Sequence, residues 1–229
     1  MNNLFLKFPS TPHLAVLGEN KIRDDKVLSR KNRDAFLKNR LIVEEKIDGA
    51  NLGISFDGQG NLILQNRGSI LLQPYSGQWK KLAKWLPPRL ENLFDHLHDQ
   101  YILFGEWCFA KHSVEYNRLP DYYLGFDLFD KTSKQFFPFD LRNQMFERMN
   151  ISSVPFIKRG AFSLLQLERL MGNSRFSDDP AEGIYLRHDG DNWLKQRAKL
   201  VKAKFIQTID VHWSRKTITQ NQIMGNSYL

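Results

Sequence analysis

Residues 43–56, "VEEKIDGANLGISF", place a lysine inside a stretch that otherwise has the pattern of a buried strand. Because side chains alternate along a strand, Lys46 and Asp48 are expected to point to the same side. Gly49 follows directly, and a glycine allows a ligand or another backbone segment to approach closely. A lysine in this setting is either a solvated residue of an edge strand or a nucleophile, and the rest of the sequence has to distinguish the two.

The residues around this lysine predict antiparallel strands and separate helices. "LGISF" (52–56) alternates in polarity, "DGQG" (57–60) is a turn signal, and "NLILQNRG" (61–68) returns, which predicts a β-hairpin. Further strands are predicted at 101–107, 122–130, 182–189 and 197–205, and helices at 77–100 (interrupted at Pro87 and Pro88), 140–149 and 162–171. Strands and helices that are segregated in this way indicate an α+β fold.

The bulk composition is that of a globular protein. The chain has 229 residues, of which 41% are hydrophobic and 25% charged, and it contains no apolar run long enough to cross a membrane. The N-terminal residues lack the long apolar run of a secretory signal. A single cysteine, Cys108, excludes an internal disulfide and a cysteine-based zinc site. We therefore expect a reduced, cytoplasmic location and no membrane partner.

The charge balance favours a polyanionic partner. The chain carries 33 basic and 25 acidic side chains, for a formal net charge of +8. Many basic proteins bind no nucleic acid, so this feature gains weight only when combined with a specific site.

A lysine that transfers a nucleotidyl group needs partners of defined chemistry. Its amine has to lose a proton close to a phosphorus atom, and carboxylates have to hold Mg²⁺ and orient the nucleotide. Cations have to stabilise the developing phosphate charge, and an aromatic ring commonly packs against the base. Lysine suits the nucleophilic role because its pKa falls readily when it is desolvated or placed near positive charge.

Six segments, in order, resemble the motifs of the covalent nucleotidyltransferases, the superfamily of ATP-dependent ligases and mRNA capping enzymes. They are "EEKIDGAN" (44–51), "QNRG" (65–68), "LFGEW" (103–107), "YYLGFDLFD" (122–130), "AEGIYLR" (181–187) and "RAKLVKAKF" (197–205). Asn51 is similar to the corresponding residue of RNA ligases of the RNA ligase 2 type, whereas DNA ligases and capping enzymes usually carry arginine there. The whole chain also resembles stand-alone bacterial proteins of the RNA ligase family.

The resemblance implies a nucleotidyltransferase (adenylation) domain of antiparallel sheets flanked by helices. We expect this domain over residues 1–208, followed over 209–229 by a tail that is either mobile or in contact with RNA. DNA ligases and capping enzymes generally continue into an OB-fold domain, but too few residues follow Phe205 for such a barrel. A minimal ligase of this kind leaves RNA clamping to a helper protein or a further domain.

The resemblance also implies a role for each candidate residue. Lys46 would attack the α-phosphate of ATP to form lysyl-AMP, AMP would pass to an RNA 5′-phosphate end, and a 3′-hydroxyl end would displace it. Asp48 would help to place Lys46 or a metal-bound water, and Glu182 would hold Mg²⁺, with Mn²⁺ as the alternative. The other nucleotide contacts implied are Glu45, Asn51 (phosphate or polynucleotide end), Arg67 (ribose or phosphate), Glu106 (ribose hydroxyls) and Phe126 (stacked on adenine).

The last motif leaves two registers open. Members of the superfamily commonly place two cations on one side of a strand, facing the α-phosphate. Lys199 and Lys202 match the bacterial relatives best, but a regular strand would send them to opposite faces unless a bulge follows Lys199. Lys202 and Lys204 share a face and form the alternative register.

Three functions follow from these observations. The first is an ATP-dependent RNA ligase. The second is a DNA-joining or capping-type nucleotidyltransferase, against which Asn51 and the expected lack of an OB-fold argue. The third is a non-catalytic RNA-binding module on the same fold, which is disfavoured because Lys46, Glu182 and the cations of the last motif are all present.

Overall fold

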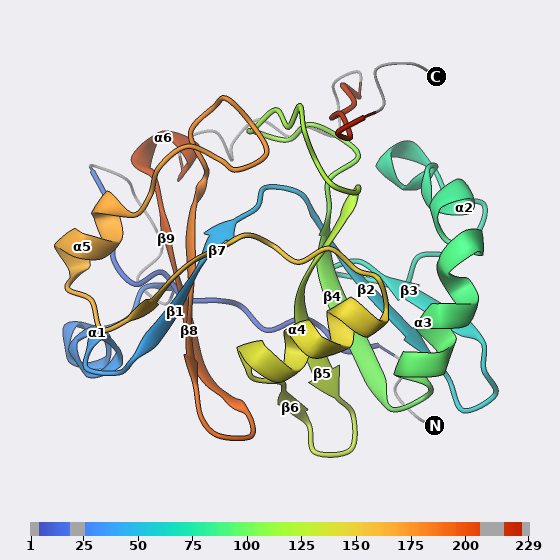
Figure 1. The fold of residues 1–229 in the computed structure, drawn as a ribbon, viewed down its shortest axis with the longest axis horizontal. Helices are drawn as coiled ribbons and strands as arrows, with labels where there is room; N and C mark the ends of the chain where they lie inside the picture. Colours follow the sequence, from blue (N-terminus) through green and yellow to red (C-terminus); the bar gives the residue numbers. More distant parts are fainter. Residues whose placement is uncertain (1–4, 19–25, 207–217, 226–229) are drawn as a thin grey trace.

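Two antiparallel sheets lie side by side at the centre of the protein (Figure 1). The computed structural model describes residues 5–18, 26–206 and 218–225. The smaller sheet has the strand order β7-β1-β8-β9, and the larger sheet the order β3-β2-β4-β5-β6. The α+β fold predicted from the sequence is confirmed.

The strands and helices match most of the predicted segments, but the strands at Phe156–Gly160 and Gln135–Phe136 were not predicted. The smaller sheet consists of β1 (Leu41–Lys46), β7 (Phe156–Gly160), β8 (Gly183–Asp189) and β9 (Leu194–Val201). The larger sheet consists of β2 (Ala50–Phe56), β3 (Leu62–Gln65), β4 (Tyr101–Trp107), β5 (Tyr123–Asp130) and β6 (Gln135–Phe136). The α-helices are α1 (Arg30–Leu37), α2 (Leu82–Trp85), α3 (Leu90–Leu97), α4 (Phe139–Arg148), α5 (Leu164–Arg169) and α6 (Ala203–Ile206); η2 (Gly77–Trp79) and η3 (Pro87–Arg89) are 3₁₀-helices.

The two faces of the smaller sheet differ in chemistry. Its outer face is apolar and packs against Phe36 of α1 and Leu167 of α5 (Figure 1). This outer face consists of Leu41, Val43, Ile184, Leu186, Ala198 and Leu200. Because side chains alternate along each strand, the intervening residues form an inner face that points toward the larger sheet. The polar residues of the inner face are Glu44, Lys46, Tyr185, Arg187, Arg197 and Lys199, and Ile42 and Val201 lie on the same face.

Buried ion pairs connect the inner face to its surroundings. Arg142 of α4 donates to Glu44 at 2.6 Å, and the side chains are 0% and 1% exposed. Arg187 and Arg197 both donate to Asp127 of the larger sheet, at 2.5 and 2.9 Å. Buried charges are tolerated only when they are paired and hydrogen-bonded. These pairs therefore join the two sheets through a polar layer.

The larger sheet contains the predicted hairpin. Strands β2 and β3 pair antiparallel, and the Asp57 carboxylate accepts hydrogen bonds from the backbone amides of Gln59 and Asn61 in the turn. The face of this sheet that bears Leu52 packs against α2 and α3 through a continuous apolar core. The opposite face, with Phe104, packs against Phe8 near the cavity described below.

The last predicted strand is shorter than expected. Strand β9 ends at Val201, and α6 begins at Ala203. The pairing of β9 with β8 is regular from Lys199 to Val201, so no bulge follows Lys199. Instead, the Lys202 amide donates to the Glu182 carbonyl at 2.9 Å, and the chain then turns into α6.

Part of the predicted tail is attached to the domain. Residues 218–225 pair with the loop 108–122, through bridges such as Ala110 with Gln220 and Leu119 with Ile223. The remainder of the tail, 209–217 and 226–229, lies outside the described residues.

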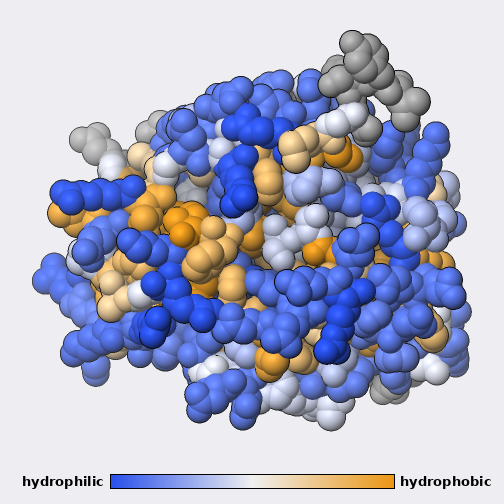
Figure 2. Space-filling model, in the orientation of Figure 1, coloured by the Kyte–Doolittle hydropathy of each residue, from blue (hydrophilic) through white to orange (hydrophobic). Residues whose placement is uncertain are grey.

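The surface is hydrophilic over most of the face shown in Figure 2. Apolar side chains gather on this face over α5 and β7, where Leu165 and Phe156 are exposed. Among the described residues, no helix combines the length and the apolar character that crossing a membrane requires.

Candidate active site

A cavity of about 140 Å³ between the two sheets collects most of the predicted site residues. The predicted residues that line it are Glu45, Lys46, Asn51, Arg67, Glu106, Phe126 and Lys199. Strands β1 and β9 supply the two lysines from the inner face, whereas β2, β4 and β5 supply Asn51, Glu106 and Phe126 from the larger sheet. The structure therefore brings these seven residues together around one cavity, and the roles expected for them stay predictions.

Lys46 forms an ion pair at the end of β1. Its Nζ donates to Glu182 Oε2 at 2.6 Å, and the two side chains are 22% and 15% exposed. Lys46 pairs across the sheet with Gly183, where a Cβ would lie 2.1 Å from the Leu200 carbonyl oxygen. Any larger residue at Gly183 would therefore push β9 away and displace Glu182.

The charges around Lys46 keep it protonated. Burial lowers the pKa of Lys46, but the negative charges of Glu182, Glu106 and Asp48 more than offset this effect, so its pKa lies above the ordinary value. Lys46 is thus a cation in the ligand-free protein. Its use as a nucleophile requires a change that weakens these charges or removes the proton.

Asn51 and Glu106 present acceptor atoms that have no protein partner. The two residues lie opposite each other on β2 and β4, and Asn51 Oδ1 and Glu106 Oε2 are both buried without a hydrogen bond. Such orphaned acceptors are costly unless a ligand supplies donors. Burial raises the pKa of Glu106 to about 8, although Lys46 opposes this shift. Hydroxyl groups of a bound ligand fit this pair.

Lys199 and Arg67 add positive charge to the same cavity. Lys199 lies opposite Tyr185 on the inner face, and Arg67 is an exposed residue that follows β3. Burial, together with the nearby charges of Lys46 and Arg67, lowers the pKa of Lys199 to about 8. Three cations around one cavity are suited to a polyphosphate.

Lys202 and Lys204 do not line this cavity. Lys202 Nζ donates to the Gly172 carbonyl at 2.7 Å in an exposed position. Lys204 is also exposed, with its ammonium group 4.8 Å from the centre of the Phe205 ring. Because β9 ends at Val201, the structure brings only Lys199 of these three lysines into the cavity.

Phe126 reaches the cavity because of a β-bulge. The pairing of β4 with β5 shifts register, so that Phe104 opposes Asp127 and Gly105 opposes Gly125, leaving Phe126 as the extra residue. A bulge of this kind can re-aim a side chain, so Phe126 and Asp127 can both face the smaller sheet. Phe126 contacts Phe8 edge-to-face, with ring centres 5.2 Å apart. These two rings form an apolar wall of the kind that a flat base requires.

The side chains of Glu45 and Asp48 hold loops. Glu45 accepts hydrogen bonds from the Ser174 hydroxyl at 2.5 Å and the Arg175 amide at 2.9 Å. Asp48 Oδ2 accepts from the amides of Ser113 and Val114, at 2.6 and 3.0 Å. Glu45 lines the cavity but its carboxylate is already engaged, and Asp48 is not a lining residue. Glu45 and Asp48 lie on either side of Lys46 in the sequence. Glu45 therefore attaches this segment to the loop at 174–175, and Asp48 attaches it to the loop at 113–114.

The N-terminal segment contributes to the cavity, although the sequence pattern does not predict this. Phe8, Pro9 and Thr11 line the cavity, and the segment runs beside β9, where the Lys199 amide donates to the Pro12 carbonyl. Thr11 Oγ1 also lies 3.4 Å from the Tyr185 hydroxyl. Nothing in the sequence indicated these contacts, because the segment lacks strand or helix periodicity. The other lining residues not predicted are Glu44, Ile47, Val154 and Tyr185.

The acidic groups beside Lys46 fit a divalent cation only in part. Glu182 and Glu106 could each supply a carboxylate oxygen. No cluster of three or more potential ligands among His, Cys, Asp and Glu occurs in the described part of the chain. Mg²⁺ is commonly held by one or two carboxylates together with water and substrate phosphates. This pair of carboxylates fits that mode of binding.

The fold and the cavity agree with the class of domain that the sequence motifs resemble. The chain belongs to the RNA ligase family, because the model of that family, described as RNA ligase, matches residues 39–204. No curated protein matches the chain in a sequence search.

Solved structures of Naegleria gruberi RNA ligase share the fold. A mutant without ligand is 14% identical with a TM-score of 0.62 and covers 94% of this chain and 60% of its own. A mutant with AMP and Mn is 16% identical with a TM-score of 0.59, and the match covers 76% of this chain and 53% of that one. A mutant with ATP and Mn is 14% identical with a TM-score of 0.56, covering 76% and 53%. The chain thus spans about half the length of these ligases.

Proposed function

We propose that this protein is an ATP-dependent RNA ligase that joins a 5′-phosphate end to a 3′-hydroxyl end. The observation that carries the proposal is the position of Lys46, which is paired with Glu182 and lines a cavity together with the cations Lys199 and Arg67. Membership in the RNA ligase family supports the activity. The Naegleria gruberi structures with ATP or AMP and Mn support the choice of nucleotide and the use of a divalent metal.

The proposed reaction has three displacement steps at phosphorus. Deprotonated Lys46 Nζ forms a bond to the α-phosphorus of ATP, and the bond to the bridging oxygen breaks so that pyrophosphate leaves with the electron pair. A 5′-phosphate oxygen of RNA then attacks the same phosphorus, the P–N bond breaks with uptake of a proton on nitrogen, and Lys46 leaves as the neutral amine. Finally, an RNA 3′-hydroxyl loses its proton and attacks the 5′-phosphorus, which releases AMP. Positioning and charge stabilisation carry most of the catalysis in such steps.

Five of the lining residues, besides Lys46, have a task in this scheme. Lys199 and Arg67 stabilise the negative charge that develops on the phosphates. Asn51 and Glu106 supply the unpartnered acceptors for hydroxyl groups, and Phe126 packs against the adenine. A divalent cation bound at Glu182, Mg²⁺ or Mn²⁺, would supply positive charge that offsets both this carboxylate and the phosphates.

The setting of the reaction is part of the same proposal. We infer a cytoplasmic location from the single cysteine, which is buried and free. A helper protein or a further domain would clamp the RNA strands outside the small cavity.

An end-joining assay tests the proposal. We expect the protein, with ATP and Mg²⁺, to seal a nicked duplex whose reacting ends are RNA and whose 5′-phosphate is labelled. The same substrate with DNA at both ends should be joined more slowly, and Lys46→Ala should join neither. Faster joining of the DNA ends would favour the DNA ligase alternative, and joining by Lys46→Ala would refute the proposed nucleophile.

A further inference from the structure

Residues 218–225, which we call the strap, are bound along the loop 108–122 (Figure 1). The hydrogen bonds between their backbones run in both directions. They are Lys111 to Thr219 (2.8 Å), Asn221 to Phe109 (3.0 Å), Gln222 to Tyr116 (2.8 Å), Leu119 to Gln222 (3.0 Å) and Met224 to Leu119 (2.8 Å), each from amide to carbonyl. The loop therefore depends on the strap for several of its backbone partners.

Asn221 is the centre of this attachment. Its side chain is completely buried, with 0% exposure. Its Oδ1 accepts from the Tyr116 amide at 2.9 Å, and its Nδ2 donates to the carbonyls of Cys108 at 2.8 Å and Ala110 at 3.2 Å. One side chain thus satisfies three backbone groups that span the first half of the loop.

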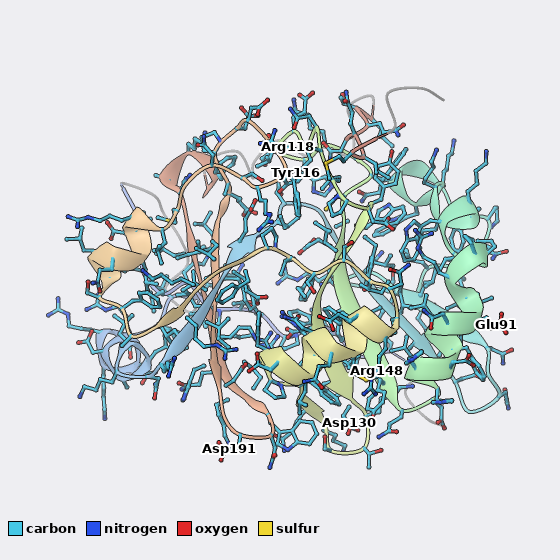
Figure 3. All side chains as sticks on the ribbon, viewed as in Figure 1. Glu91, Tyr116, Arg118, Asp130, Arg148 and Asp191 are labelled. Carbon is cyan, nitrogen blue, oxygen red and sulfur yellow. The ribbon has the colours of Figure 1, made fainter. Side chains whose placement is uncertain are left out.

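The same loop is bonded to the residue two positions after Lys46. The Asp48 amide donates to the Tyr116 hydroxyl at 2.8 Å, and the Asp48 carboxylate accepts from the amides of Ser113 and Val114. Figure 3 shows Tyr116 on this loop, at the same end of the two sheets as Arg118. Tyr116 therefore connects Asn221 to Asp48, because its backbone amide binds the Asn221 side chain and its side-chain hydroxyl binds the Asp48 amide.

A second set of contacts connects the loop 108–122 to the loop that binds Glu45, the residue directly before Lys46. Arg118 pairs with Asp178 at 2.7 Å, and the Asn117 amide donates to the Phe176 carbonyl at 3.1 Å. This joins the loop 108–122 to the neighbouring loop that Glu45 binds through Ser174. Lys46 therefore lies between two anchored residues, Glu45 and Asp48, and the strap supports Asp48 through the loop 108–122.

We propose that the strap, through Asn221, is a positioning element for the nucleophile Lys46. Asn221 does not line the cavity, so its effect on the reaction passes through the loop and Asp48. Misplacement of a reacting group by about 1 Å can slow a reaction about 100-fold, even when the altered residue is distant. The inference rests on the proposed function, in which Lys46 attacks ATP.

The first test compares Asn221→Ala with Gln222→Ala. Gln222 is exposed and its hydrogen bonds to the loop use its backbone, so its side chain is a matched control within the strap. We expect Asn221→Ala to slow single-turnover formation of lysyl-AMP by about 10-fold to 100-fold, with little change in the Kd of ATP. Gln222→Ala should keep the parent rate. An unchanged rate in Asn221→Ala, or equal losses of rate and of ATP affinity, would overturn the proposal.

The second test measures the coupling between Asn221 and Asp48. If the strap acts through Asp48, the double variant with Asp48→Ala should be no slower than the slower single variant. Multiplicative effects would show that the two residues act independently and would refute the connection. If Asn221→Ala is too unstable to purify, Tyr116→Phe removes only the hydroxyl that receives the Asp48 amide, and it should slow lysyl-AMP formation with ATP affinity retained. A parent rate in Tyr116→Phe would equally overturn the proposal.

Hydrogen exchange separates this inference from the proposed function. Relative to the parent, Asn221→Ala, or Tyr116→Phe in its place, should exchange faster at the amides of Asp48, Ser113 and Val114, with β8 and β9 unchanged. Failure of the parent protein to form lysyl-AMP would refute the proposed function. Hydrogen exchange alone would then show whether the strap holds the segment that contains Asp48. An effect that stays within the loop and does not reach Asp48 would overturn the inference.

Discussion

The inner and outer faces of the smaller sheet are built from alternating residues of the same strands but have different roles. The outer face packs against helices, and the inner face holds most of the charged groups. Outer-face residues such as Val43 and Leu200 are buried among apolar side chains of α1 and α5. Inner-face residues one position away, such as Glu44 and Lys199, lie in a layer of charges between the sheets. Apolar burial on this sheet is thus concentrated on the outer face, and the inner face holds most of the reactive and charged groups.

The difference shows how a charged face can be kept inside a protein. Part of the inner face is neutralised by buried ion pairs, with Arg142 at Glu44 and with Arg187 and Arg197 at Asp127. The remaining charges surround the cavity, where a polyphosphate ligand can compensate them. The following predictions test this division between structural and ligand-directed charges.

The largest effect is expected for a structural charge. Arg142→Met leaves the Glu44 carboxylate buried without its partner, and we expect a loss of about 3–5 kcal/mol in the free energy of unfolding. The measurement is urea denaturation at neutral pH. Arg159→Met is the control, because Arg159 pairs with Asp140 at the surface, with 34% and 67% exposure, and should cost no more than about 1 kcal/mol. Equal losses in the two variants would contradict the assigned role of the polar layer.

A ligand-directed charge should affect the reaction more than the fold. Lys199→Ala removes a cation from the cavity, and we expect lysyl-AMP formation to slow by about 100-fold to 1000-fold. Lys202→Ala should slow it far less, because Lys202 binds the Gly172 carbonyl outside the cavity. Rapid-quench measurement of the first step compares the two. A larger loss in Lys202→Ala would instead support the register in which Lys202 faces the phosphate.

The aromatic wall should contribute to nucleotide affinity. Phe126→Leu is expected to weaken ATP binding by about 10-fold, as is typical when stacking on a base is lost. Phe129→Leu is the matched control on the same strand, because Phe129 is buried in the core and does not line the cavity. Calorimetric titration with ATP should show a change for Phe126→Leu alone. Unchanged affinity in that variant would disprove the stacking assignment.

The smallest effect is a dependence of affinity on pH. The pKa values of Lys199 and Glu106 are both about 8, so between pH 7 and pH 9 Lys199 loses its positive charge and Glu106 gains a negative one. Both changes make the cavity less attractive to phosphate, so the affinity for α,β-methylene-ATP should fall several-fold as the pH rises. The double variant Lys199→Arg with Glu106→Gln should bind with nearly constant affinity over this window, because neither new side chain titrates there. If the affinity changed equally with pH in the parent and in the double variant, Lys199 and Glu106 would not be the groups responsible.

Much of this arrangement follows from local sequence pattern. Alternation and turn signals predict the hairpin of β2 and β3, and the order of the motifs brings Lys46, Glu106 and Lys199 into one cavity. Because side chains alternate along a strand, Lys199 and Lys202 cannot both face the phosphate from one regular strand. The structure differs from the predicted bulge because β9 ends at Val201 before Lys202.

The remaining features depend on contacts between residues far apart in the chain. The pair of Arg142 with Glu44, the edge of the cavity at Phe8 and the attachment of Asn221 to the loop 108–122 have no periodic signature. Glu45 and Asp48 were predicted to contact nucleotide or nucleophile because of their motif. In the ligand-free structure their carboxylates bind loop amides and a hydroxyl, and these contacts depend on loops that are distant in the sequence.

The most direct test of the account is the covalent labelling of the protein with ATP. The parent protein and Lys46→Ala are incubated with α-³²P-labelled ATP and Mg²⁺ or Mn²⁺ and then denatured. Each protein is digested, and the peptide that carries the label is identified. The account predicts label on the peptide that contains Lys46 in the parent and no label in the variant. Absence of covalent label with either metal, or label on another residue, would contradict the proposed role of Lys46 and of the cavity around it.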